Sequence, residues 1–509
     1  MQSFQQAIEA VDFYSPAEER FNRRRRTVGL CAAPLIFVGL LLWPMPALAP
    51  PAHRLLAVLA VVATLWMTEA VPLAIAAVLG PALVVVLGVA PAPLAFAPFA
   101  DPIVFLFIGS FILAEAMFVH GLDRWIACRV LAMPWLGTSG MRLLVAYVAV
   151  TVFVSMWVNN TATTAMMFPI GMALIAQIGR AARPGDQAVR EFAGAMMLAT
   201  AFGACLGGMA APVGTPPNLI GIGMLQRLAG VRISFVGWMA FGVPMAALLT
   251  ACLIWLIGRG GVRRFTLPVP AADLVRDELA RLGPMSPGQR NVALAFGGTV
   301  LLWVLPGLLG LRGTGASAID QVYSSPVPEG VAAILGAALL FVLPIDWKTR
   351  RFTLTWEEAA RIDWGIVLVY GGGLALGELA FSTGLAAALG QPLVGGAGVH
   401  TTLALTVAFT AAAILLSQMT SNTAAAAILV PIAIAACQTA RVSPVEAALG
   451  ATLGASMGLV LPISTASNAI VYSSGYVPVR AMIRTGIVLD LLALLVIVAA
   501  VTALGPLFH

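Results

Sequence analysis

The sequence predicts an all-α polytopic membrane protein with eleven transmembrane helices and two re-entrant helical hairpins in an inverted repeat. Three observations lead to this fold class. Hydrophobic residues make up 60% of the 509 residues and charged residues 10%, whereas about 25% of a soluble protein is charged. Apolar segments of membrane-spanning length follow one another along the chain. Lastly, the two halves carry the same polar motif inside apolar sequence.

The predicted membrane spans account for most of the chain. Because one crossing needs about 20 apolar residues, we place spans at residues 28–48, 54–67, 71–90, 102–119, 191–225, 234–257, 291–311, 329–345, 364–386, 445–475 and 485–506. Two further apolar segments, 143–179 and 401–438, are long enough for two helices each and carry polar residues midway. We predict that each is a hairpin that returns to its own side of the membrane.

The basic residues set the predicted orientation. If the N-terminus is cytoplasmic, the cytoplasmic segments hold all but five of the 28 lysines and arginines, as the positive-inside rule requires. The five exceptions are Arg54, Arg227, Arg232, Arg312 and Arg441. The net charge of +6 therefore calls for no nucleic-acid partner. We expect a multi-pass protein of the cell inner membrane, with the N-terminus cytoplasmic and the C-terminus outside.

Two related motifs organise the chain. They read SMWVNNTATTAMMFP at 155–169 and SQMTSNTAAAAILVP at 417–431, so that each begins with serine and reaches an Asn-Thr pair five residues later. A second matching element follows each motif, GTPPN at 214–218 and STASN at 464–468. Uncharged hydroxyls and amides therefore cluster where apolar helix would otherwise continue.

The segments ahead of the hairpins also match each other. Residues 101–122 and 363–385 both place glutamate six residues after a glycine, and Gly-Leu another six residues on. The order helix, hairpin, interrupted helix thus occurs twice, with an odd number of crossings between the copies, which defines an inverted repeat. The predicted units are a cytoplasmic N-terminal segment 1–27 with a surface helix over 1–22, a first repeat 28–258 with its interrupted helix at 191–225, a cytoplasmic linker 259–290, and a second repeat 291–509 with its interrupted helix at 445–475.

Hairpin tips and helix breaks at membrane depth have a defined chemistry. Hydrocarbon cannot satisfy free backbone groups, so such backbone is buried in protein or lines a water-filled cavity. A break exposes amide N–H groups that favour an anion and carbonyl groups that favour a cation. We therefore predict an anion site flanked by cation sites near the midplane, built without formal charge.

The paired motifs resemble those of the divalent anion:sodium symporter family. The resemblance extends over residues 66–72, 105–122, 282–286, 364–385 and 468–475, and so covers nearly the whole chain. It implies a homodimeric elevator-type transporter in the lipid bilayer that carries dicarboxylates, citrate or sulfate together with sodium ions.

The resemblance also implies roles for individual residues. One sodium site would use Ser155, Asn159, Asn160 and Gly214, and the other would use Ser417, Ser421, Asn422 and Ser464. The substrate carboxylates would be contacted by Asn160, Thr161, Asn422 and Thr423, with Thr215 and Thr465 lining the site. Because Asn159 stands where the family has serine, we expect the first sodium site to be the weaker one.

Sodium-coupled uptake of a divalent organic anion, such as a C4-dicarboxylate, is the function we expect. Sulfate or citrate symport and sodium-independent anion exchange on the same fold are the alternatives. Exchangers that resemble this family often carry arginine after the Asn-Thr-Ala run, where this chain has Thr163 and Ala425, which favours symport.

An enzymatic function is not expected. The four histidines are isolated near the ends of spans, and the five cysteines show no metal-type spacing. Glu115 and Glu378 lie in predicted spans, where a carboxylate by default marks function. Because both lie near the end of a span, we favour a structural role in which they reach interfacial water or an arginine.

Overall fold

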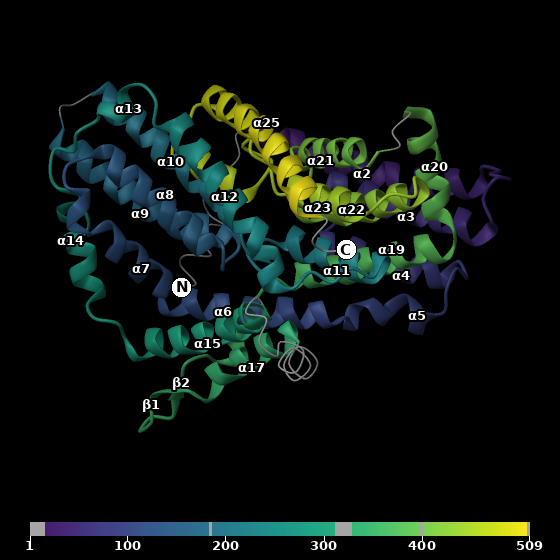
Figure 1. Cartoon of the computed structure of the whole chain (residues 1–509), viewed down its shortest axis with the longest axis horizontal. Coiled ribbons are helices and arrows are strands. Elements are labelled where there is room, and N and C mark those ends of the chain that lie inside the picture. Colours follow the sequence, from purple (N-terminus) through teal and green to yellow (C-terminus); the bar gives the residue numbers. More distant parts are fainter. Residues whose placement is uncertain (1–15, 183–185, 311–327, 398–400, 506–509) are drawn as a thin grey trace.

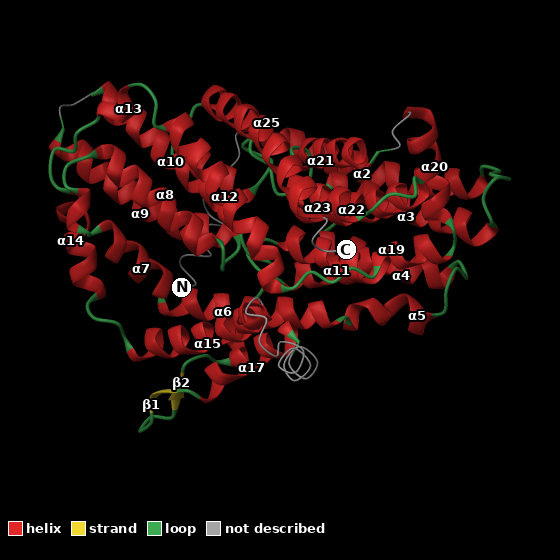
Figure 2. Ribbon diagram, viewed as in Figure 1, coloured by secondary structure: helices red, strands yellow, loops and turns green. Residues whose placement is uncertain are grey.

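The computed structural model describes residues 16–182, 186–310, 328–397 and 401–505, and these residues are almost entirely helical (Figure 2). The sheet formed by the described residues has two short antiparallel strands, β1 (Pro344–Asp346) and β2 (Arg351–Phe352). Nine of the described helices are long and apolar enough to cross a membrane. The protein is thus a nearly all-α integral membrane protein.

The first half of the chain alternates long helices with short connecting turns. Its elements are α2 (Pro16–Leu42), α3 (Pro50–Thr68), α4 (Leu73–Val86), α5 (Ala92–Phe96), η1 (Ala97–Ala100), α6 (Pro102–His120), α7 (Leu122–Leu131), η2 (Pro134–Leu136), α8 (Gly140–Ser155), α9 (Asn160–Ala181), α10 (Gln187–Gly208), α11 (Pro216–Ala229) and α12 (Phe235–Ile257). Proline stands in the first turn of α3, α6 and α11, where its missing N–H costs no hydrogen bond.

The second half repeats this order after two short linker helices. Its helices are α13 (Gly261–Arg264), α14 (Ala271–Leu282), α15 (Pro287–Gly310), α17 (Glu329–Val342), α18 (Trp356–Ala359), α19 (Trp364–Ser382), α20 (Leu385–Ala397), α21 (Thr402–Ser417), α22 (Asn422–Thr439), α23 (Val445–Gly454), α24 (Ala466–Tyr472) and α25 (Val479–Leu504). Thr355 begins α18 with a capping box, because its side chain accepts the Glu358 N–H while the Glu358 carboxylate accepts the Thr355 N–H.

Several predicted boundaries near the N-terminus differ from the structure. The first membrane helix, predicted at 28–48, begins already at Pro16 and ends at Leu42. The predicted surface helix over 1–22 falls largely on residues 1–15, which lie outside the described residues, and from Pro16 onward the chain is continuous with α2. The span predicted at 71–90 stops at Val86, because the turn that follows requires the left-handed conformation of Gly88 (φ 66°).

The hairpins and the interrupted helices pack together across the two repeats (Figure 1). In the first repeat α8, α9 and α12 pack on α10, and in the second repeat α21, α22 and α25 pack on α23. The halves interlock because α11 packs on α22 and α23, while α24 packs on α9 and α10. The remaining long helices form two further groups, α6 with α15 and α17, and α2, α3 and α4 with α19.

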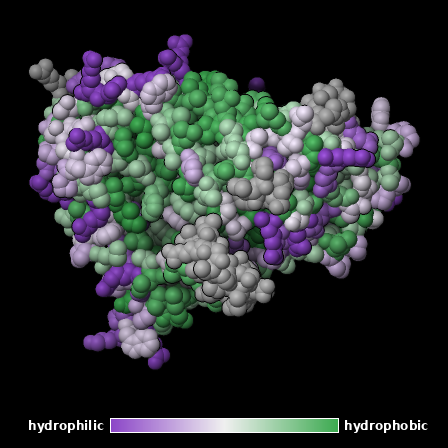
Figure 3. Space-filling view, viewed as in Figure 1, coloured by the Kyte–Doolittle hydropathy of each residue, from purple (hydrophilic) through white to green (hydrophobic). Residues whose placement is uncertain are grey.

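The surface is apolar over much of the face that Figure 3 shows. Hydrophilic side chains gather at its left edge, over α13 and α14, and at the lower left over β1 and β2. Long apolar side chains are exposed on the spans, including Leu35 on α2, Leu294 on α15 and Leu495 on α25. In a soluble protein such exposure would be a liability, but in a bilayer these side chains meet lipid.

Candidate functional site

The two hairpin tips start their second helices in different ways. The side-chain oxygen of Asn159 accepts a hydrogen bond from the Ala162 N–H at 2.8 Å and so acts as the N-cap of α9. Ser421 holds the equivalent position before α22, but its side chain forms no capping bond. The hydroxyl of Ser421 therefore stays available to a ligand, whereas the carbonyl oxygen of Asn159 already has a partner.

One asparagine in each repeat stabilises the break of the interrupted helix, and the two asparagines form equivalent hydrogen bonds. Asn218 and Asn468 are fully buried, and each Nδ2 donates to the backbone carbonyls ten and seven residues earlier. The acceptors and distances are Gly208 (2.9 Å) and Ala211 (2.8 Å) in the first repeat, and Gly458 (3.0 Å) and Leu461 (2.9 Å) in the second. These bonds satisfy carbonyls that the break would otherwise leave bare.

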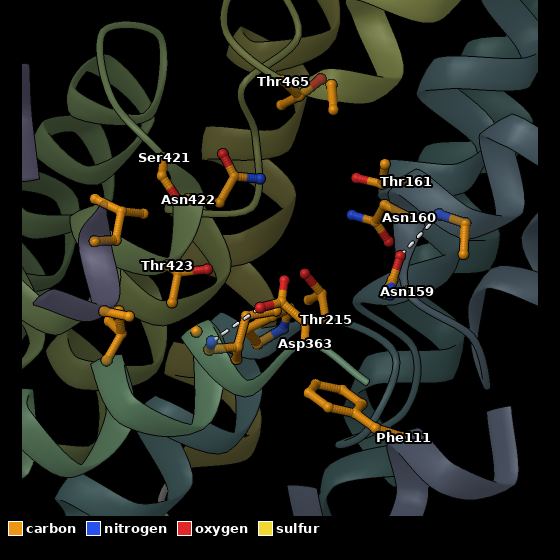
Figure 4. A pocket seen from close by; sticks show the side chains of 18 of the residues that line it. Phe111, Asn159, Asn160, Thr161, Thr215, Asp363, Ser421, Asn422, Thr423 and Thr465 are labelled. Atoms are coloured by element: carbon orange, nitrogen blue, oxygen red, sulfur yellow. Dashed lines mark hydrogen bonds between the residues drawn. The ribbon is translucent and has the colours of Figure 1, made fainter. Parts of the chain in front are cut away.

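The tips and the breaks enclose one cavity of about 850 Å³. Figure 4 shows Asn159, Asn160 and Thr161 on one side of it and Ser421, Asn422 and Thr423 on the other. The residues predicted to contact the substrate all line this cavity: Asn160, Thr161, Thr215, Asn422, Thr423 and Thr465. Residues far apart in the sequence thus converge from both repeats on one space.

Of the predicted sodium ligands, some line the cavity and others lie behind it. The lining members are Asn159, Asn160, Ser421, Asn422 and Ser464. Ser155, Gly214 and Ser417 are buried and are not among the lining residues. The predicted cation ligands are therefore divided between the wall of the cavity and the protein behind it.

The charged side chains around the cavity balance. Among the described residues that line it, the cationic ones are Arg25, Arg26 and Arg361, and the carboxylates are Glu69, Glu115 and Asp363. Arg25 is also within 2.9 Å of Glu69 in an ion pair. The tip residues themselves are uncharged, so the cavity offers a dianion no net positive charge from its side chains.

Oxygen atoms converge on a small pocket behind the first tip. A Cβ atom built on Gly208 would clash with Oδ1 of Asn160 and lie 3.2 Å from the carbonyl oxygen of Gly214. A Cβ atom built on Gly214 would lie 2.6 Å from the Gly208 oxygen and 2.8 Å from the Met156 oxygen. Side-chain and backbone oxygens at such spacing suit a hard cation such as sodium.

The hydroxyl of Ser155 belongs to this first pocket. It lies 3.0 Å from Oδ1 of Asn160 and 2.6 Å from the backbone oxygen of Ala204. The side-chain oxygen of Asn160 therefore has a protein partner, which a bound cation must share or displace.

A similar group of oxygen atoms lies behind the second tip, but here the side-chain oxygen of the tip asparagine has no hydrogen-bond partner among the described residues. A Cβ atom built on Gly458 would lie 2.9 Å from the Ser417 backbone oxygen and 3.0 Å from Oδ1 of Asn422. Oδ1 of Asn422 and Oγ of Ser456 are buried and have no hydrogen-bond partner within the described part of the chain. Because a buried polar atom without a partner costs free energy, the free Oδ1 of Asn422 is suited to a cation, whereas Oδ1 of Asn160 in the first pocket already accepts a hydrogen bond from Ser155.

Glu378 lies in an ionic cluster that joins three helices. Arg227 on α11 forms an ion pair with Asp101 at 2.7 Å, and Glu378 on α19 lies 3.8 Å from the same guanidinium. The hydroxyl of Tyr370 donates to the other oxygen of Asp101 at 3.0 Å. Glu378 thus reaches an arginine, in line with the structural role expected for it, whereas Glu115 faces the cavity together with Arg361.

Sequence reasoning missed several residues that the structure brings to the site. Gly208, the last residue of α10, and Gly458, in the second break, lie where the oxygens converge, and a glycine within an apolar segment gave no signal of this. Gln418 hydrogen-bonds the loop of the second break. Its partner Asp490 could have been found, because a carboxylate inside the apolar run 485–506 is itself a signal of function.

This arrangement defines a class of protein. Two hairpins and two broken helices in an integral membrane protein surround a cavity, an arrangement typical of secondary transporters. The family model of the sodium:sulfate symporter transmembrane region matches residues 24–508. The chain belongs to this family, the divalent anion:sodium symporters.

Curated relatives and a solved structure agree with this assignment. The sodium-dependent dicarboxylate transporter SdcS of Staphylococcus saprophyticus is 33% identical over 502 residues, which cover 97% of this chain and 94% of that protein. SdcS of Staphylococcus aureus (strain USA300) is 31% identical over 486 residues, with coverages of 94% and 91%. The crystal structure of the YdaH transporter of Alcanivorax borkumensis matches 80% of this chain and 86% of its own with a TM-score of 0.53, and at 14% identity this likeness concerns the fold alone.

Proposed function

We propose that the protein is a secondary transporter that couples sodium entry to uptake of a divalent organic anion, with a C4-dicarboxylate as substrate. The proposal rests on the charges that line the cavity, where the positive and negative side chains are equal in number and leave no net positive charge for a dianion. A dianion that leaves water needs opposite charge nearby, and the two oxygen-lined pockets offer places for cations to supply it. Two Asn-Thr tips on opposite sides of the cavity suit a ligand with a carboxylate at each end. The SdcS relatives are sodium-dependent dicarboxylate transporters, which supports the same function.

Uptake into proteoliposomes tests this function. We expect succinate to accumulate when a sodium gradient points inward, and the uptake to stop when potassium replaces sodium. Sulfate and citrate are the competitors to compare, because the matched family model describes sodium:sulfate symport. Competition by sulfate but not by malate would reverse the order of substrates. Sodium-independent uptake that is accelerated by anion on the opposite side would establish exchange instead.

The proposed mechanism is an elevator within a homodimer of the inner membrane. The hairpins, the interrupted helices and the helix after each of them would move as one body, because these elements pack mainly on one another. The other long helices would remain as the scaffold. Arg25, Arg26 and Arg361, which the positive-inside rule places in the cytoplasm, line the cavity, so the described state corresponds to a cavity open to the cytoplasm.

A cysteine pair across the proposed boundary should stop transport. A Cβ atom built on Gly373 of α19 would lie 3.2 Å from Cβ of Ala427 on α22, near the Cβ separation of about 3.5–4.5 Å found in disulfides. In a background without the five native cysteines, we expect oxidation of Gly373→Cys/Ala427→Cys to lower the initial rate of succinate uptake at least tenfold, and a reductant to restore it.

The single variants Gly373→Cys and Ala427→Cys, treated with the same oxidant, are the controls. Full-rate uptake by a protein shown to be cross-linked on a non-reducing gel would rule out sliding between α19 and α22.

A further inference from the structure

Asp490 is a buried carboxylate that the proposed function does not yet use. It lies in the middle of α25 and is 6% exposed. Its Oδ2 accepts a hydrogen bond from Nε2 of Gln418 at 2.8 Å, while its Oδ1 has no hydrogen-bond partner among the described residues. Within the described part of the chain, no lysine, arginine or histidine forms an ion pair with it. A carboxylate in this position inside a membrane span is costly unless a cation approaches it.

Gln418 connects this carboxylate to the second hairpin tip. It directly follows Ser417, and its backbone oxygen accepts a hydrogen bond from Ser464 at 3.1 Å. Its side chain donates to the Met457 carbonyl at 2.6 Å and accepts from the Val460 N–H at 2.9 Å. Asp490 is therefore one side chain away from the backbone that forms the second cation pocket.

The first repeat lacks this polar pair at the equivalent positions. Gly242 of α12 packs on the carbonyls of Met209 and Ala210, and Gly486 of α25 packs in the same way on Leu459 and Val460. Met209 and Ala210 lie as far before Asn218 as Leu459 and Val460 lie before Asn468. The two glycines therefore occupy equivalent positions in α12 and α25. Four residues after each of these glycines, the first repeat has Ala246 at the position equivalent to Asp490. In the hairpin tips, Met156 occupies the position equivalent to Gln418. Among the described residues, a hydrogen bond between a membrane-buried carboxylate and a tip residue at these positions therefore occurs in the second repeat and not in the first.

We propose that Asp490 is a positioning residue that supplies the counter-charge for the cation at the second tip and makes that pocket the tighter of the two. This inference rests on the proposed sodium coupling. The geometry supports it in three ways: a buried carboxylate with a free oxygen, a connecting glutamine at the tip, and an unpartnered oxygen in the pocket, Asn422 Oδ1. A unit charge about 10 Å from an ion, at an effective dielectric constant of about 20, changes the affinity on the order of tenfold.

The variant Asp490→Asn tests the charge while it preserves the acceptor for Gln418. We expect the sodium concentration for half-maximal succinate uptake to rise about tenfold, with the maximal rate at saturating sodium unchanged within about twofold. The sodium-dependent rise in Tm of the purified protein in detergent should shift to higher sodium by the same factor. Loss of a purely structural contact would lower the maximal rate without displacing these titrations.

Two further variants keep the test decisive. Gln418→Met/Asp490→Ala gives the second repeat the pair that the first repeat already accommodates, and it should show the same shift even if Asp490→Asn folds poorly. Glu446→Gln changes another buried carboxylate, at the start of α23, and should leave the sodium titration unchanged.

The result that would overturn the role of Asp490 is a sodium titration of Asp490→Asn, or of the double variant, that coincides with that of the unmodified protein. Failure of the proposed function would look different, because the unmodified protein would then show no sodium dependence of uptake or of Tm.

Discussion

Replacing Asn422 by alanine is expected to abolish sodium-coupled uptake. The side chain of Asn422 faces the cavity, and its unpartnered Oδ1 points into the second cation pocket. Under the proposed function, alanine would remove an oxygen ligand of the ion and an N–H donor to the anion at once. Since a hydrogen bond to a charged group contributes about 1.5–3 kcal/mol, the loss of both should lower uptake at fixed sodium by about a hundredfold or more. Initial rates in proteoliposomes measure this effect.

Asn422→Asp separates the two roles of this side chain. The carboxylate keeps an oxygen for the cation but repels the anion, so the sodium-dependent rise in Tm should persist while succinate uptake is lost. If Asn422→Ala retained more than about a tenth of the uptake, the second tip would not be the site of coupling.

Replacing Gly208 by alanine should have a large, though smaller, effect at the first tip. The new methyl group would clash with Oδ1 of Asn160 and would lie 3.2 Å from the carbonyl oxygen of Gly214. A small core cannot absorb this change without strain, so we expect sodium-coupled uptake to fall at least tenfold. Cell-surface or membrane yield should change much less, because the rest of α10 is unaltered.

Gly203→Ala on the same helix is the matched control. Its nearest neighbour would be Cγ2 of Thr151 at 3.5 Å, an ordinary van der Waals contact, and uptake should stay close to that of the unmodified protein. Equal losses in the two variants would show that α10 tolerates no added methyl group and would remove the argument for an ion pocket at Gly208.

Much of the architecture could be predicted because the membrane imposes strong patterns on the sequence. Runs of apolar residues mark the spans, and the two copies of the Asn-Thr motif mark the tips, since each copy repeats the spacing to its own break. The cavity lining followed from the same motifs. The N-terminal end of α2 was harder, because a helix can continue from the membrane into water when its polar residues also favour helix.

The remaining features depend on contacts that sequence spacing does not encode. Whether the amide of Asn159 caps α9 or turns into the pocket is decided by the backbone of the tip. Gln418 and Asp490 meet across 72 residues. Arg227, assigned by sequence to an outside loop, lies in the last turn of α11 and pairs with Asp101, the buried N-cap residue of α6. Each of these contacts arises from the packing of helices that the sequence predicts separately.

The ionic cluster around Arg227 has a consequence for the direction of transport. It fastens α11 to α6 and α19 at the end of the molecule that the charge distribution assigns to the outside. In the proposed elevator, outward movement of α11 would withdraw the guanidinium from Asp101, whose side chain is 5% exposed, and an unpaired buried carboxylate costs several kcal/mol. The empty carrier would then rest facing the cytoplasm. The outward movement of the empty transport domain, and not the binding of substrate, would limit the turnover rate.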